Sequence, residues 1–209
     1  MKTSFDEIKR MSFRALDGAG VPQGVDEESA YATAWLEASG LPGLKLLGDA
    51  LDGLELEDRR LSPGFEITGA RLAADAGGVS AVFLGPGLMD TMIWLAGEHG
   101  TAAEMDIARL QHPGFLIAFA GQAKAREAAI SVEYPPEQNG AIDVRLRTGP
   151  SGETDWNAFA ARREQSYQDG IEADEAAFAR VYAYSRKILV PETEESRLSG
   201  AGAGLTDND

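Results

Sequence analysis

The spacing of apolar residues changes near residue 60, and this change does most to limit the fold. Up to about residue 54, apolar side chains recur every three or four positions, as they do along one face of a helix. From Ser62 onward, short runs of β-type residues are separated by glycine, which is typical of strands. The sequence therefore predicts a helical N-terminal part followed by a body that contains a β-sheet.

Three helices are predicted in the first sixty residues. Ser4 followed by Glu7 fits a capping box at the start of the first helix, which is expected over residues 5–17. The second helix is expected to stop at Gly40, and the third to begin with Pro42, whose missing amide hydrogen costs nothing in a first turn. These helices are predicted to form a three-helix unit.

The first half of the body is predicted to contain two strands and two helices. Apolar runs over residues 65–73 and 79–84 are interpreted as strands. Pro86 is expected to open a short helix over residues 87–95, and Pro113 to open another. Both helices are expected to pack on the sheet.

The second half of the body carries the clearest strand pattern. Residues 130–134 and 142–146 alternate apolar and polar side chains around a turn, which predicts a hairpin with Glu133 paired across it to an arginine. A further strand is expected around residues 159–163, and a last helix around residues 178–189. The predicted class is α+β, with a three-helix unit, a central mainly antiparallel sheet with packed helices, and a C-terminal helix.

The whole chain, residues 1–209, is expected to form a single compact domain. Within it, residues 1–60 are expected to form the helical subregion, residues 62–190 the α+β body, and residues 191–209 a glycine-rich tail. No internal repeat is visible in the sequence.

Composition excludes several classes of function. The chain has 34 acidic and 19 basic residues, a net charge of −15, so nucleic-acid binding is not expected. It has no cysteine, which rules out disulfides, thiolate metal sites and cysteine nucleophiles. No apolar run reaches the roughly 20 residues of a membrane span, and the N-terminus does not resemble a signal peptide. We therefore expect a soluble, cytoplasmic protein with no membrane partner.

No motif in the sequence identifies a reaction. The two histidines, His99 and His112, are not spaced as metal ligands, and no metal site is predicted. The GPG stretch at residues 85–87 follows a β-like run but lacks the spacing and lysine of a phosphate loop. Neither a cofactor nor a catalytic residue is identified, so enzymatic activity is left open.

Two stretches, "SFDEIKRMSFRALDGAGVPQGVDEESAYATAWLEASGLPG" and "LVPETEESRLSGAGAGLTDND", resemble an uncharacterised bacterial family of unknown function. That resemblance covers essentially the whole chain and implies no established activity. The N-terminal arm alone is similar to that of the non-Rossmann malate and L-lactate dehydrogenase family. That family follows its arm with a Ser-His-Gly turn, whereas this chain continues "GLPGLKLLGD" with no histidine before His99. The nicotinamide site of that family is therefore not expected here.

The C-terminal "SRLSGAGAGLTDND" is the most distinctive stretch. Small residues allow a backbone to pass close to another surface, and successive amides can bind an anion. Disorder is the alternative, because the stretch is glycine-rich and acidic. We expect it to border a cleft that binds a small anionic metabolite, with these candidate residues: Ser196, Arg197, Gly200, Gly202, Gly204 and His112. The alternative function is a non-catalytic accessory or self-associating protein, a homo-oligomer that uses the apolar face of the N-terminal helices, including Trp35.

Overall fold

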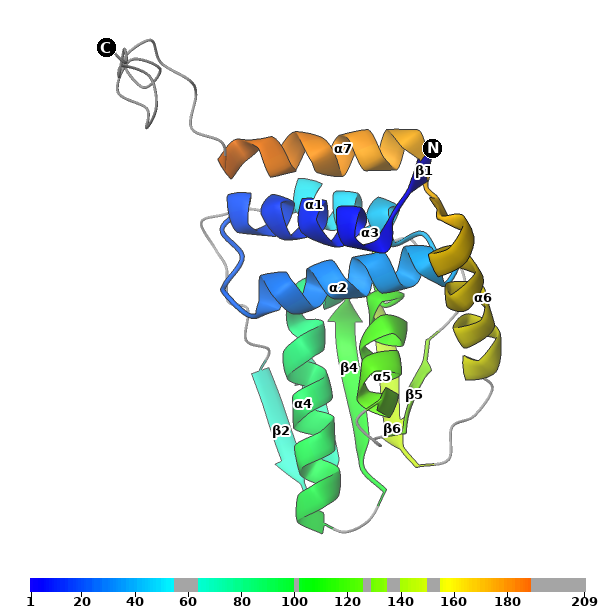
Figure 1. Cartoon of the computed structure of the whole chain (residues 1–209). Helices are drawn as coiled ribbons and strands as arrows, with labels where there is room; N and C mark the ends of the chain where they lie inside the picture. The colour runs from blue at the N-terminus through cyan, green and yellow to red at the C-terminus, as the bar shows by residue number, and fades with distance from the viewer. Residues whose placement is uncertain (55–63, 100–101, 126–128, 135–139, 150–154, 189–209) are drawn as a thin grey trace, which may run out of the picture.

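The computed structural model describes residues 1–54, 64–99, 102–125, 129–134, 140–149 and 155–188 (Figure 1). The helices in these residues are α1 (Phe5–Gly18), α2 (Val25–Ala38), α3 (Gly43–Asp52), α4 (Ala81–His99), α5 (Phe115–Ala125), α6 (Trp156–Asp169) and α7 (Glu175–Ser185), followed by the 3-10 turn η1 (Arg186–Ile188). The strands are β1 (Lys2–Thr3), β2 (Gly64–Thr68), β3 (Arg71–Asp75), β4 (Glu104–Leu110), β5 (Ile130–Glu133), β6 (Ile142–Thr148) and β7 (Ile171–Glu172).

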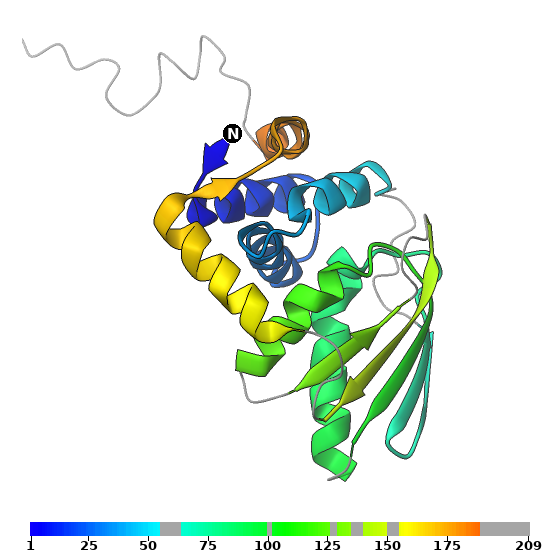
Figure 2. The same cartoon turned by 90° about the vertical axis from the view of Figure 1, so that its right-hand side faces the viewer.

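Five strands form a sheet in the order β2-β3-β4-β6-β5. Only β3 and β4 run parallel, and α4 connects them; the other neighbouring pairs are antiparallel. Helices α4 and α5 lie on one face of this sheet (Figure 2). The predicted α+β class and mainly antiparallel sheet are therefore confirmed, as is the hairpin formed by β5 and β6. In that hairpin Glu133 pairs with Arg147 at 3.4 Å.

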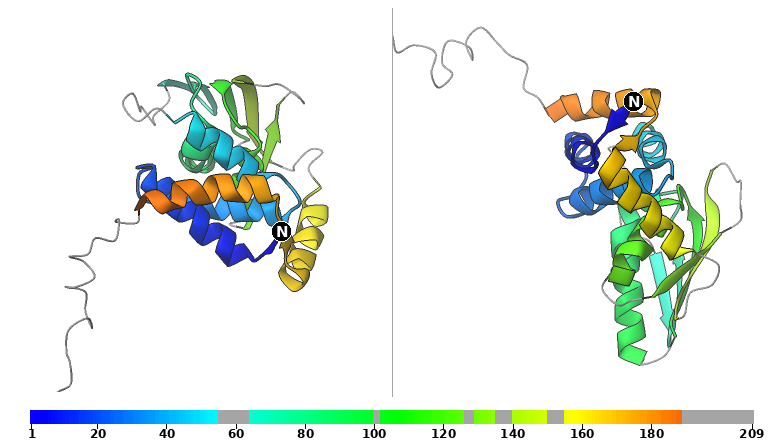
Figure 3. Two further views of the ribbon diagram at one scale, coloured as in Figure 1. Left: turned by 90° about the horizontal axis from the view of Figure 1, so that it is seen from above. Right: turned by 45° about the vertical axis from the view of Figure 1, so that its right-hand side comes forward.

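The helical layer combines the two ends of the described chain. Helix α7 packs along α1, so it joins the three N-terminal helices (Figure 3). The short strands β1 and β7 pair antiparallel, with Thr3 opposite Ile171. The predicted cap of α1 is present, because the Ser4 hydroxyl accepts a hydrogen bond from the Glu7 amide at 3.1 Å. The Glu7 carboxylate, however, accepts from the Thr3 hydroxyl at 2.8 Å.

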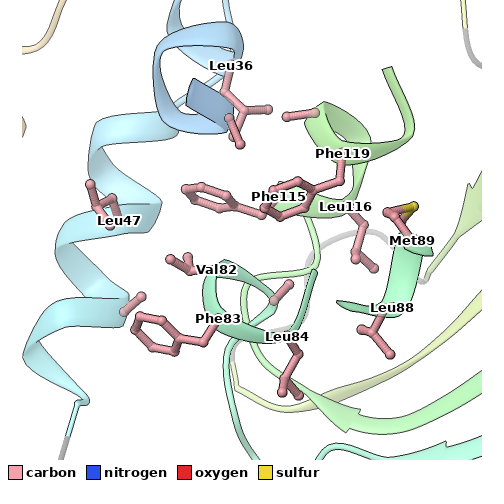
Figure 4. Packing of buried hydrophobic residues seen from close by; sticks show 14 of the residues in the cluster. Leu36, Leu47, Val82, Phe83, Leu84, Leu88, Met89, Phe115, Leu116 and Phe119 are labelled. Carbon is pink, nitrogen blue, oxygen red and sulfur yellow. The ribbon is translucent and has the colours of Figure 1, made fainter. Parts of the chain in front are cut away.

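Large apolar side chains join the helical layer to the helices that cover the sheet. Figure 4 shows Leu36 of α2 and Leu47 of α3 around Phe115 of α5 and Val82 of α4. All four side chains are completely buried. A continuous core therefore fixes α2 and α3 against the start of α4 and α5.

The predicted strand over residues 79–84 is wrong, because Ala81–His99 is one helix with Pro86 inside it. A proline in a helix interior leaves the carbonyl four residues earlier without its amide donor. Here that carbonyl belongs to Val82, and the hydroxyl of Ser29 in α2 donates to it instead. A hydrogen bond from α2 thus replaces the one that the backbone of α4 cannot make to this carbonyl.

Two further predictions need correction. The strand expected around residues 159–163 lies within α6, whose first amides are capped by Asp155 at 3.0–3.1 Å. The run 65–73 is not one strand but the hairpin of β2 and β3, which turns at Gly69 with φ of 58°. Strand β4, at the centre of the sheet, was not predicted.

Candidate functional site

A cavity of about 750 Å³ opens between α1, α2, α5 and η1. We call it the cationic pocket. The described residues that line it are Asp6, Lys9, Arg10, Phe13 and Arg14 of α1, Glu27, Glu28, Ala30 and Tyr31 of α2, Gln122 of α5, and Ile188 of η1. Its volume lies within the range of about 300–1,000 Å³ that is common for small-molecule sites.

Three cationic side chains project from α1 into this pocket. Lys9, Arg10 and Arg14 form no ion pair with any other described residue. The ammonium group of Lys9 lies 5.8 Å from the ring centre of Tyr31. Arg10 and Arg14 are four positions apart on one helix, where like charges destabilise the helix by about 0.2–0.5 kcal/mol. The pocket thus brings together three cationic side chains of α1, beside three acidic side chains from α1 and α2.

The wall formed by α5 adds an unsatisfied donor. The side-chain amide nitrogen of Gln122 is shielded from solvent and has no hydrogen-bond partner among the described residues. Such a donor is costly unless an acceptor reaches it, at roughly 1–3 kcal/mol. Gln122 also lines the cavity that holds the three cations, although its amide nitrogen is shielded from solvent.

The acidic side chains of the pocket have a structural explanation. Asp6 lies in the first turn of α1, and Glu27 and Glu28 lie in the first turn of α2. Carboxylates are stabilised there by the helix dipole. The neighbouring Asp26 is buried and accepts from the amides of Gly24 and Glu27 at 2.9 and 2.8 Å, which caps α2.

The arrangement is suited to holding a small anion. A guanidinium can donate two parallel hydrogen bonds to a carboxylate, and an ammonium adds a point charge. Phe13 and Tyr31 provide apolar walls, and the Tyr31 ring is held edge-on by Phe5 at 5.3 Å. No histidine, serine or threonine is among the described lining residues.

The structure separates the site residues expected from sequence. Ser196, Arg197, Gly200, Gly202 and Gly204 lie outside the described residues. The last described residue, Ile188, lines the cationic pocket.

His112 does not line that pocket. It lies just before α5 and contacts Ser80, which precedes α4. His99 is the last residue of α4 and is exposed. No group of three acidic or histidine side chains among the described residues could hold a metal ion.

Sequence reasoning missed Lys9, Arg10 and Arg14. Their clustering in "KRMSFR" is a visible signal in so acidic a chain. Two other predictions from the sequence were wrong. The GPG stretch lies inside α4 and not at a strand-to-helix turn. Trp35, expected on an exposed helix face, is 4% exposed and packs against Trp156 and Phe159.

The fold is shared with several dehydrogenases and reductases. A dehydrogenase from Sinorhizobium meliloti aligns with a TM-score of 0.65 and 15% identity, over 88% of this chain and 99% of that chain. Δ1-Piperideine-2-carboxylate reductase from Pseudomonas syringae pvar. tomato aligns with a TM-score of 0.55 and 11% identity, over 88% and 99%. Malate dehydrogenase from Pyrococcus horikoshii OT3 aligns with a TM-score of 0.52 and 14% identity, over 88% and 65%. The similarity thus extends beyond the N-terminal arm, and identities this low show the fold alone.

At the level of sequence, residues 3–79 match the model of a family described as "Protein of unknown function (DUF3726)". The resemblance of the opening stretch to a family of unknown function is therefore confirmed. No curated protein matches the sequence. The link from α2 to α3 contains Pro42 as the residue before the helix. None of the described helices is both long and apolar enough to span a bilayer.

Proposed function

We propose that the protein binds a small metabolite with one or more carboxylate groups in the cationic pocket, in the bacterial cytoplasm. The observation that carries this proposal is the convergence of Lys9, Arg10 and Arg14 on one cavity without an ion pair to any described residue. Unpaired cations on one helix repel one another, and an anion relieves that repulsion.

The names of the structures with this fold support the chemical class. Malate and Δ1-piperideine-2-carboxylate, named in two of them, are both small carboxylates. An apolar portion of such a ligand would lie against Phe13 and Tyr31. Its carboxylate would accept from the guanidinium groups.

We also propose that the C-terminal stretch borders this pocket. Ile188, the last residue that the structure describes, lines the pocket. Candidate residues in this stretch remain Ser196, Arg197, Gly200, Gly202 and Gly204. His112 is left out of the proposed site because it does not line the cavity.

Calorimetric titration with malate, lactate, succinate and citrate tests the proposal. At least one acid should bind, and the double substitution Arg10→Gln and Arg14→Gln should weaken binding at least roughly tenfold, about 1.4 kcal/mol. Arg186→Gln is the matched control, because Arg186 is an exposed arginine of η1 that does not line this pocket. Equal losses in the control would mean that net charge and not the pocket attracts the acid. Failure of all four acids to bind would contradict the proposal.

A further inference from the structure

A second cavity, of about 660 Å³, lies between the link from α2 to α3, helix α6 and the start of α7. It shares no lining residue with the cationic pocket. Its charged lining residues are Glu37, Lys45, Arg162, Glu172, Asp174 and Arg180. The charges of these six side chains are not equally available to a ligand.

Two of the three cations are neutralised by α3. Arg180 donates to Asp49 at 2.6 Å and to Asp52 at 3.0 Å, so its guanidinium is held between two carboxylates. The ammonium group of Lys45 lies 2.7 Å from the Asp49 carboxylate. Neither acid lines the cavity. Arg180 and Lys45 therefore form part of the wall, and their charge is already compensated.

Of the three carboxyl groups of the cavity, Glu172 pairs with the ammonium group of Lys2 at 3.8 Å. Each of the other two uses one oxygen for the backbone. Glu37 accepts from the Leu44 amide at 2.8 Å, and Asp174 accepts from the Ala177 amide at 2.8 Å as the cap of α7. Burial raises the pKa of Glu37 against the effect of its hydrogen bond from Leu44, and the nearby charge of Asp174 raises it further. Two carboxyl groups thus repel each other at the cavity wall.

The third cation, Arg162, has a different environment. Its side chain lies over the link from α2 to α3, with its Nε 3.6 Å from the position that a Cβ would occupy at Gly40. Its hydrogen bond is to the side-chain oxygen of Gln165, at 3.4 Å. In the part of the chain that the structure describes, Arg162 forms no ion pair with a carboxylate. The cavity thus presents an uncompensated guanidinium together with two carboxyl groups.

We propose that this cavity binds a small zwitterion of the amino-acid class, with its ammonium group beside Glu37 and Asp174 and its carboxylate on Arg162. The ammonium relieves the repulsion between the two carboxyl groups and uses the oxygens that the backbone leaves over. The carboxylate pairs with the guanidinium. Both charges of the ligand are needed, because either one alone leaves the opposite charge of the cavity uncompensated.

A thermal-shift screen of the full chain against the twenty standard amino acids tests this. At least one amino acid should raise the melting temperature, and its corresponding amine without the carboxylate, and acid without the amine, should each bind at least roughly tenfold more weakly in calorimetry. Glu37→Gln and Arg162→Gln should each cause a similar loss. Glutamine retains the oxygen that accepts from Leu44, so the first variant is expected to fold, and far-ultraviolet circular dichroism checks this.

Glu164→Gln is the matched control, because Glu164 is an exposed acid on α6 that does not line the cavity. It should bind as the wild type does, and so should the Arg10 and Arg14 double variant. The proposal is overturned if no amino acid binds, if binding survives Glu37→Gln, or if the amine alone binds as well as the amino acid. Loss of binding in the Arg10 and Arg14 variant would assign the ligand to the cationic pocket instead. The outcome is independent of whether a simple carboxylic acid binds there.

Discussion

The imidazole Nδ1 of His112 lies 2.9 Å from the hydroxyl oxygen of Ser80, and this contact joins the starts of α5 and α4. The Ser80 oxygen also accepts from the Val82 amide at 3.1 Å. The hydroxyl retains one proton and one lone pair for His112, so either tautomer of the neutral imidazole satisfies the contact. The backbone of His112 has φ of 51°, an uncommon conformation for a side-chain-bearing residue. The neutral imidazole therefore serves to hold a strained junction in place.

Stability should depend on the protonation of His112. Burial lowers its pKa from the ordinary value of 6.5, and Lys45 lowers it further while Asp49 opposes the shift. As pH falls below about 6.5, the unfolded chain takes up this proton before the folded protein does, so the free energy of unfolding decreases. His112→Gln should flatten this decrease, measured by urea denaturation between about pH 7 and 5.5. His99→Gln, measured alongside, accounts for the other histidine, and an unchanged slope in His112→Gln would refute the assignment.

The elements that the sequence predicted well are those whose structure depends on residues close together in the sequence. Helix α1 follows from Ser4, whose hydroxyl caps the Glu7 amide three residues later. The hairpin of β5 and β6 follows from strict alternation. In α6 the local signal is weak, because Ser166 is the one described residue of that helix that is buried. Most of its side chains face solvent, so no apolar face marks the helix.

Helix α4 and the cationic pocket depend instead on contacts between distant residues. A short apolar run such as 79–84 fits a buried strand or a buried helix equally well. The donor that makes a helix feasible across Pro86 is Ser29, which lies 53 positions before Val82. The pocket likewise combines α1 with Gln122 and Ile188. The cluster of cations could be found from the sequence, but its partners could not.

Two glycines of α4 should respond in opposite ways to alanine. A Cβ at Gly85 would lie 2.2 Å from the buried ring of Phe119, whereas a Cβ at Gly87 would meet nothing within 4 Å. Gly85→Ala should therefore destabilise the protein by about 1–3 kcal/mol through overpacking. Gly87→Ala should stabilise it by about 0.5–1 kcal/mol, because alanine is the better helix former. Urea denaturation measures both, and equal effects would show that the ring of Phe119 yields freely.

Trp35 should contribute to folding and not to self-association. Its ring centre lies 5.7 Å from that of Phe159, and the guanidinium carbon of Arg163 lies 4.5 Å above it. Trp35→Ala should reduce the free energy of unfolding by about 3–5 kcal/mol, and Trp35→Phe by less. Light scattering after size-exclusion chromatography provides the second readout. A change in oligomer size in Trp35→Ala without loss of stability would restore the self-association hypothesis.

The bond from Ser29 to the Val82 carbonyl should be coupled energetically to Pro86. Ser29→Ala removes the donor and leaves a buried carbonyl unsatisfied, which should cost about 1–3 kcal/mol. Pro86→Ala supplies a backbone amide in its place, so Ser29→Ala should cost less in that background.

A double-mutant cycle measured by urea denaturation should give a coupling of about 1 kcal/mol or more. Ser12→Ala is the matched control, because the buried Ser12 hydroxyl has no hydrogen-bond partner among the described residues, and its removal should be neutral or stabilising. If the costs of Ser29→Ala and Pro86→Ala simply add, another group satisfies Val82 and the explanation for a helix across Pro86 fails.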